Sequence, residues 1–159
     1  MPEPKQELIV SRQVISLPQR FSTGPIMGRF LRELRDNKRI MAAKCPSGRF
    51  LLPPREVDAI SLEEPTEWVE VGPEGIIRDY DVIYYASPDP LTGSTREVPY
   101  IVVWVLLDGV EGDAPLWHLL ETEDPLAVRR GQRVRAVFAE ERTGHLFDIK
   151  HFVLTEEAA

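Results

Sequence analysis

The chain has little cysteine, little histidine and no long apolar segment. Its 159 residues include one Cys and three His. One thiol allows no internal disulfide, and a structural zinc site takes four Cys or His ligands, so neither device can hold this fold together on its own. No segment reaches the roughly 18 apolar residues of a membrane span, and the first residues are too polar for a signal peptide. We expect a soluble cytoplasmic protein without membrane contact.

The chain also lacks an excess of positive charge. It carries 26 Asp and Glu against 19 Lys and Arg, a net charge of -7. Proteins that follow a phosphate backbone need clustered Lys and Arg, so the composition argues against a nucleic-acid partner. With 43% hydrophobic residues, the chain can bury a core of one domain, or of one small domain with an appendage.

The first part of the sequence predicts an extended arm followed by an amphipathic helix. Residues 8–17 are rich in β-branched side chains, and Gly24-Pro25 is typical of a helix start. An apolar stripe with helical spacing follows, made of Met27, Phe30, Leu31 and Leu34. Such a stripe most often packs on its own core, but the flanking segments look too thin to cover it. We therefore predict that residues 1–39 form an arm and a docking helix, and that the stripe binds a partner.

The rest of the chain predicts a small irregular module and a barrel. Residues 44–55 have the frame of a zinc-ribbon knuckle, and residues 40–67 contain many turn formers. From residue 68 to 155 the sequence contains five β-rich segments, with a link between the third and the fourth, which is the rhythm of an OB-fold. We expect a mainly β protein with a degenerate zinc-ribbon-like module at 40–67 and a five-stranded OB-fold barrel at 68–155.

Five segments together resemble the zinc-ribbon OB-fold proteins that are associated with thiolase-superfamily enzymes and acyl-CoA metabolism. Their order and spacing carry the resemblance; the segments are Phe30-Leu31-Arg32-Glu33-Leu34-Arg35-Asp36, Gly48-Arg49-Phe50-Leu51-Leu52-Pro53-Pro54-Arg55, Trp68-Val69-Glu70-Val71, Pro99-Tyr100-Ile101-Val102 and Arg130-Gly131-Gln132-Arg133-Val134. In that family, two Cys-x-x-Cys pairs hold zinc. The matching positions here are Lys44, Ser47, Asp58 and Ser61.

All four zinc positions depart from the family pattern, so we expect no zinc. If the module keeps its shape, other contacts must replace the metal. We expect these contacts to come from apolar residues, namely Phe50, Leu51, Leu52, Val57, Ile60 and Leu62.

The resemblance implies a non-catalytic partner subunit, and so not an enzyme by itself. The partner would be a thiolase-like protein, or a related enzyme that forms or cleaves carbon–carbon bonds in acyl-CoA, in a hetero-oligomer. The subunit would help to bind or channel acyl-CoA as a shared ligand, with no tightly bound cofactor and no catalytic residues of its own. An arginine cluster at Arg129, Arg130 and Arg133 suits the CoA phosphates, although it could equally balance nearby acidic residues.

Two other functions remain open from the residues. An OB-fold that binds single-stranded nucleic acid could stack bases on Trp104, Trp117, Tyr100 and Phe138, although these aromatic residues mostly lie in apolar segments typical of a core. A small acyl-CoA enzyme could use Cys45, whose basic neighbours would favour a thiolate. The three histidines lack the spacing of a metal site.

Overall fold

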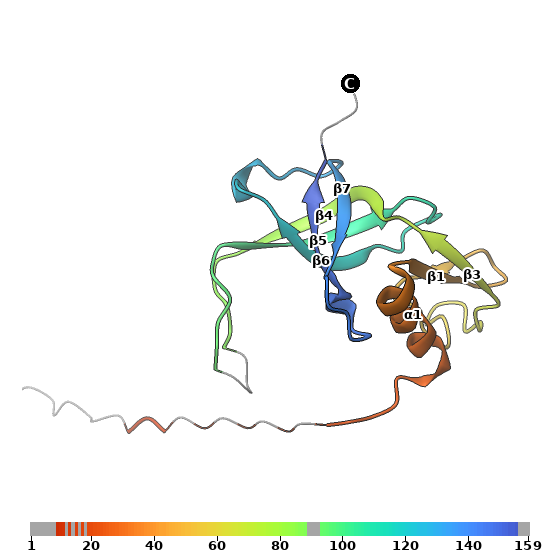
Figure 1. Cartoon of the computed structure of the whole chain (residues 1–159), viewed down its shortest axis with the longest axis horizontal. Coiled ribbons are helices and arrows are strands. Elements are labelled where there is room, and N and C mark those ends of the chain that lie inside the picture. Colours follow the sequence, from red (N-terminus) through yellow and green to blue (C-terminus); the bar gives the residue numbers. More distant parts are fainter. Residues whose placement is uncertain are drawn as a thin grey trace, which may run out of the picture.

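The computed structural model describes residues 9–11, 13, 15, 17, 19–88 and 93–155 (Figure 1). Part of the predicted arm at 8–17 lies outside these residues, and the described part forms no strand. The arm leads into one helix, a small sheet and a barrel. In the described part of the chain, no helix is long and apolar enough to span a bilayer.

Helix α1 (Gly24–Asn37) forms where the sequence predicts it. Pro25 lies in its first turn, where a missing N–H is tolerated. The helix ends at Lys38, which adopts the left-handed conformation and donates its backbone N–H to the carbonyl of Glu33. Phe30 and Leu34 are fully buried on the side of α1 that faces the rest of the chain.

The small sheet has three antiparallel strands in the order β2-β1-β3. These are β1 (Ile40–Lys44), β2 (Phe50–Leu51) and β3 (Glu67–Val71). β3 pairs with β1 over its whole length, from Val71 opposite Ile40 to Glu67 opposite Lys44. The predicted boundary at residue 68 therefore falls inside a strand of the first module, and the chain passes to the barrel at residues 72–73.

The barrel closes in the order β4-β5-β6-β8-β7, which confirms the predicted five-stranded OB-fold. The strands are β4 (Glu74–Ile83), β5 (Tyr100–Leu107), β6 (Leu116–Glu121), β7 (Arg133–Phe138) and β8 (Ile149–Leu154). Only the β6–β8 pair among them is parallel within the described residues. The predicted link between the third and fourth strands contains a 3₁₀ turn, η1 (Pro125–Ala127), and a second turn, η2 (Leu146–Asp148), precedes β8.

One continuous core joins the two parts. It includes Phe30 and Leu34 from α1, Ile40 from the small sheet, and Val103 and Phe152 from the barrel. In Figure 1, α1 packs between the small sheet and the η2 end of the barrel. The guanidinium of Arg142 also donates to the carbonyl of Arg35 across this junction, at 2.8 Å. The helix is therefore part of the fold.

Candidate functional site

The zinc-ribbon positions hold a hydrogen-bond network. The hydroxyl of Ser47 donates to the carboxylate of Glu63. The hydroxyl of Ser61 lies between two carboxylates, 2.9 Å from Asp58 Oδ2 and 3.1 Å from Glu63 Oε2. Arg49 Nε donates to Asp58 Oδ2 at 2.7 Å. Three of the four predicted positions thus meet, and Glu63, which the resemblance did not point to, joins them.

Both carboxylates of this network stay ionised. Asp58 is buried, yet the backbone N–H and hydroxyl of Ser61, with the guanidinium of Arg49, lower its pKa from 3.8 to about 2. The pKa of Glu63 is also lowered, mainly by the hydroxyl of Ser47. Their charge is compensated by hydrogen bonds and by one cation.

The donor set does not fit a zinc ion. Two serine hydroxyls are poor zinc ligands, and the fourth position, Lys44, lies over the ring of Phe50 with its ammonium 3.8 Å from Glu111. Among the residues that the structure describes, no group of three or more His, Cys, Asp and Glu could hold a metal.

The apolar replacement for the metal was predicted correctly only in part. Phe50, Leu51 and Leu52 are buried, as expected. The three other residues are exposed: Val57 by 42%, Ile60 by 75% and Leu62 by 77%. The segment of residues 57–62 therefore depends on the polar network instead.

Cys45 is a buried thiol. Burial raises its pKa, and the charges of Asp58 and Glu63 raise it further, against the smaller opposite effect of Arg49. A nucleophilic cysteine needs a lowered pKa and access to substrate. The geometry therefore removes the basis of the enzyme hypothesis that relied on Cys45.

The apolar stripe of α1 faces the chain's own core. Phe30 and Leu34 are fully buried, because the small sheet and the barrel cover them, so a partner cannot reach either side chain. Met27 and Leu31 are partly buried against the same core. Partner binding stays a prediction for these two residues only.

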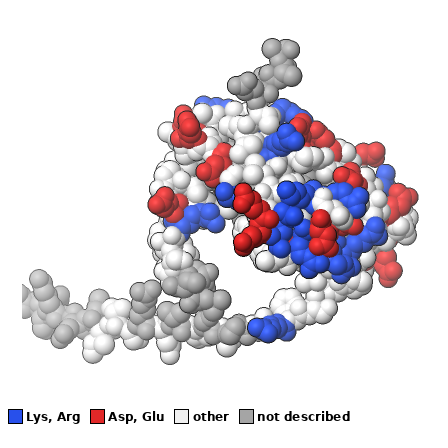
Figure 2. All heavy atoms as spheres, viewed as in Figure 1, with Lys and Arg blue, Asp and Glu red and all other residues white. Residues whose placement is uncertain are grey.

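Positive charge gathers on the outer face of α1. Residues 20–55 hold nine Lys and Arg but only two acidic residues. Figure 2 shows these basic side chains over and around the helix. Arg29 lies 4.5 Å from the ring centre of Trp68, and Arg39 pairs with Glu33. An acidic protein thus presents a basic face opposite the stripe.

The predicted CoA-phosphate arginines are engaged with other groups. Arg130 pairs with Asp79 at 2.8 Å, and Arg133 pairs with Asp108 at 2.6 Å. Arg129 donates to backbone carbonyls at the end of η1. These arginines lower the pKa of both aspartates. A phosphate at this cluster would compete with carboxylates, and its binding stays a prediction.

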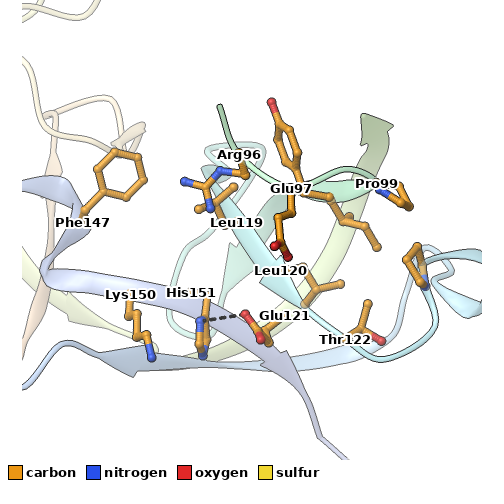
Figure 3. Close-up of a pocket in the computed structure, with 13 residues that line it drawn as sticks. Arg96, Glu97, Pro99, Leu119, Leu120, Glu121, Thr122, Phe147, Lys150 and His151 are labelled. Atoms are coloured by element: carbon orange, nitrogen blue, oxygen red, sulfur yellow. Dashed lines mark ion pairs between the residues drawn. The ribbon is translucent and has the colours of Figure 1, made fainter. Parts of the chain in front are cut away.

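A cavity of about 640 Å³ opens where β5 begins and β6 ends (Figure 3). Its polar side chains are Arg96, Glu97, Tyr100, Glu121, Thr122, Lys150 and His151, and its apolar wall includes Leu119 and Phe147. The volume falls within the range of about 300–1,000 Å³ that is common for small-molecule sites. The cavity combines two cations, two carboxylates, one imidazole and an apolar wall.

His151 and Glu121 lie next to each other in this cavity. His151 Nδ1 lies 3.4 Å from Glu121 Oε2, which Figure 3 marks with a dashed line. Burial lowers the pKa of His151, while the charge of Glu121 opposes that shift. The imidazole is therefore neutral at pH 7 and can accept a proton. Sequence reasoning missed this pair, because the parallel pairing of β6 with β8 creates it.

A second histidine lies beside the cavity, inside the barrel. His118 is fully buried, and its ring packs edge-on against Phe147, a cavity residue, and against Phe152. No described protein atom hydrogen-bonds either ring nitrogen. Burial lowers the pKa of His118 to about 4. The nearby backbone of Leu146 and Leu119 acts in the opposite direction and raises this pKa, although neither forms a hydrogen bond of normal geometry with the ring.

Two tryptophans lie side by side on the outer surface of the barrel. Trp104 in β5 pairs with Trp117 in β6, and Trp117 is 41% exposed. From the sequence, the candidate stacking residues Trp104, Trp117, Tyr100 and Phe138 mostly lie in apolar segments typical of a core. The strand instead alternates, with Val103 and Val105 inside the barrel.

Comparisons with known proteins agree with this architecture. Residues 68–139 match the family of the ChsH2 C-terminal OB-fold domain. The fold is similar to a solved structure named "Ltp2-ChsH2(DUF35) aldolase", with 18% identity, a TM-score of 0.59 and coverage of 85% of this chain and 97% of that chain. It is also similar to a DUF35-family protein of unknown function from Sulfolobus solfataricus, with 19% identity, a TM-score of 0.54 and coverage of 83% and 85%. No curated protein sequence matches.

The expectation that the protein is not an enzyme is wrong. The first of these structures is named an aldolase, and ChsH2 is part of that name. A chain of this fold can therefore be a component of an enzyme.

Proposed function

We propose that the chain is a subunit of a thiolase-like enzyme complex that acts on acyl-CoA. Residues 68–139 match the family of the ChsH2 C-terminal OB-fold domain, which supports this proposal. The observation that carries the proposal is the similarity of fold to the Ltp2-ChsH2 aldolase, which covers 85% of this chain and 97% of that chain. The partner would be a thiolase-superfamily protein in a hetero-oligomer.

We assign the chemistry of this chain to the cavity of Figure 3. Arg96 and Lys150 would hold an anionic group of the substrate, and the apolar wall would hold its acyl chain. When an aldolase cleaves a carbon–carbon bond, a base takes the proton of the neighbouring hydroxyl group as it becomes a carbonyl. The electron pair of the broken bond passes to the carbon next to the thioester carbonyl, and the resulting enolate then takes up a proton. His151, oriented by Glu121, suits that role.

The CoA phosphates would bind outside this cavity, at Arg129, Arg130 and Arg133. The side chain of Arg130 is 70% exposed despite its pair with Asp79, and Arg129 and Arg130 both border a second cavity of about 550 Å³. Arginine forks suit phosphates, so a phosphate could exchange with a carboxylate at low cost on the surface.

The test begins with the complex. The chain should co-purify with a thiolase-superfamily protein encoded beside it, and the complex should cleave or form a carbon–carbon bond in an acyl-CoA. His151→Gln and Glu121→Gln should lower kcat by about 100-fold or more without loss of the complex. Glu123→Gln is the matched control, because Glu123 is exposed on the same segment and does not line the cavity. A chain that binds no such protein would refute the proposal.

Single-stranded nucleic acid is the alternative ligand, and the exposed Trp104–Trp117 pair supports it. Asp79 and Asp81 lie on the same side of the neighbouring strand and weaken it. Titration with single-stranded DNA and RNA at low salt, followed by tryptophan fluorescence, separates the two functions. Quenching that Trp117→Leu abolishes would favour nucleic acid.

A further inference from the structure

The loop of residues 58–63 presents apolar side chains to solvent. Ile60 and Leu62 are both about three-quarters exposed, and Val57 just before the loop is also exposed. The sequence resemblance to zinc-ribbon proteins places this loop at the second pair of metal positions, Asp58 and Ser61, where metal would fix the backbone. Here the polar network fixes it while leaving the apolar side chains outside. We call residues 58–63 the second-knuckle loop.

The loop is rigid at its base without any partner. The backbone N–H of Asp58 donates to the carbonyl of Glu63, and that of Leu62 donates to the carbonyl of Asp58, each at 2.9 Å. The carboxylate of Asp58 also accepts from the backbone N–H of Ser61, at 3.0 Å. A preformed loop loses little conformational entropy when a partner binds, which favours docking.

Leu62 holds a conformation that leucine disfavours. Its φ is 59°, in the left-handed region, where a Cβ atom crowds the following backbone. Among the described residues, eight glycines have positive φ, but only Lys38 and Leu62 do so with a side chain. Lys38 ends a helix with a polar side chain, whereas Leu62 projects an apolar one into solvent. The chain therefore bears strain at Leu62 without gaining burial inside its own fold.

The charge around the loop indicates what would cover it. Glu56 and Glu64 flank the loop and are exposed. The loop also adjoins α1, because a Cβ on Gly24 would lie 2.6 Å from the carboxylate of Glu56. We propose that the second-knuckle loop docks into an apolar groove of the partner subunit, bordered by Lys or Arg, with Ile60 and Leu62 as its anchors. This inference rests on the proposed function, because that function supplies the partner.

Leu62→Gly separates docking from folding. Glycine adopts positive φ freely, so this variant should unfold at the same or a higher temperature than the wild-type chain. It should also weaken binding to the co-purified thiolase-superfamily protein by about tenfold or more, because interface anchors carry most of the affinity. Ile60→Ser should weaken binding similarly, and Leu62→Met should preserve it.

Leu126→Ser is the matched control, because Leu126 is an equally exposed leucine at η1 on the barrel. It should leave the affinity unchanged. Wild-type affinity in Leu62→Gly, or a lower unfolding temperature, would overturn the docking inference and leave the proposed function intact. Loss of all binding by the wild-type chain would refute both. The isolated chain could instead form dimers at high concentration, and Leu62→Gly could abolish them. That result would identify a second copy of the chain as the occupant and overturn the inference.

Discussion

Replacing His118 by leucine should stabilise the folded chain. The imidazole is fully buried in the barrel, and no described protein atom hydrogen-bonds its ring nitrogens. An unpaired buried polar group costs about 1–3 kcal/mol, and leucine removes that cost while filling a similar volume against Phe147 and Phe152. We expect His118→Leu to raise the free energy of unfolding by an amount in this range at about pH 8.

The same substitution should remove a pH dependence. The pKa of His118 is about 4 in the fold, against 6.5 for the free side chain. The unfolded chain therefore binds a proton more readily, so stability is complete above pH 6.5 and falls as the pH decreases toward 4. Between about pH 8 and about pH 5 the wild-type chain should lose about 2 kcal/mol through His118. The leucine variant cannot lose this contribution.

Urea unfolding at both pH values measures the two effects. His145→Asn is the control, because it removes an exposed imidazole and keeps a side chain that can accept from the backbone of Phe147. The reasoning is refuted if His118→Leu lowers stability at about pH 8, or if its stability falls between the two pH values as steeply as that of the wild type.

Three further substitutions test the fold. Phe30→Ala should lower the free energy of unfolding by about 3–5 kcal/mol in urea titrations, because this side chain is fully buried. Met27→Ala should lower it by clearly less, because Met27 is only partly buried. Equal losses would contradict the packing of α1. Gly75→Ala should impair folding, because the added Cβ would clash with the carbonyl oxygen of Leu106. Circular dichroism measures this effect, and a native spectrum and melting temperature would contradict the expectation. Asp58→Asn should lower the free energy of unfolding at pH 7. Because the pKa of Asp58 is lowered to about 2 in the fold, the difference in this free energy between variant and wild type should shrink as the pH falls from 3.8 toward 2. A difference that stays constant over this pH range would refute the role of the ionised carboxylate.

The sequence predicted the elements whose causes are local. The start of α1 follows from Pro25, and the strands of the barrel follow from β-rich segments between turns. The sequence did not allow us to predict which face of a strand, such as β5, packs against the core. Trp104 lies on the outer surface of the barrel. Because both faces of β5 are apolar, composition alone could not reveal which side chains of the strand point inward.

The candidate site could not be predicted, because distant residues create it. Glu121 and His151 are far apart in sequence and meet only through the parallel pairing of β6 and β8. No local pattern specifies which strands of a barrel become neighbours in this way. In the same way, Glu63 meets Ser47 and Ser61 only after the second-knuckle loop, residues 58–63, has folded back on residues 44–55.

Without zinc ligands at the four positions that the resemblance points to, the small module takes its stability from a core that it shares with the barrel. A structural zinc ion contributes on the order of 10 kcal/mol to a domain that needs it, and a network of a few hydrogen bonds at about 1 kcal/mol each supplies much less. The difference has to come from burial, and Phe30, Leu34 and Phe50 provide it by joining the core that continues into the barrel. Because this core carries the stability, the second-knuckle loop needs no apolar contacts of its own, which leaves Ile60 and Leu62 free to meet a partner.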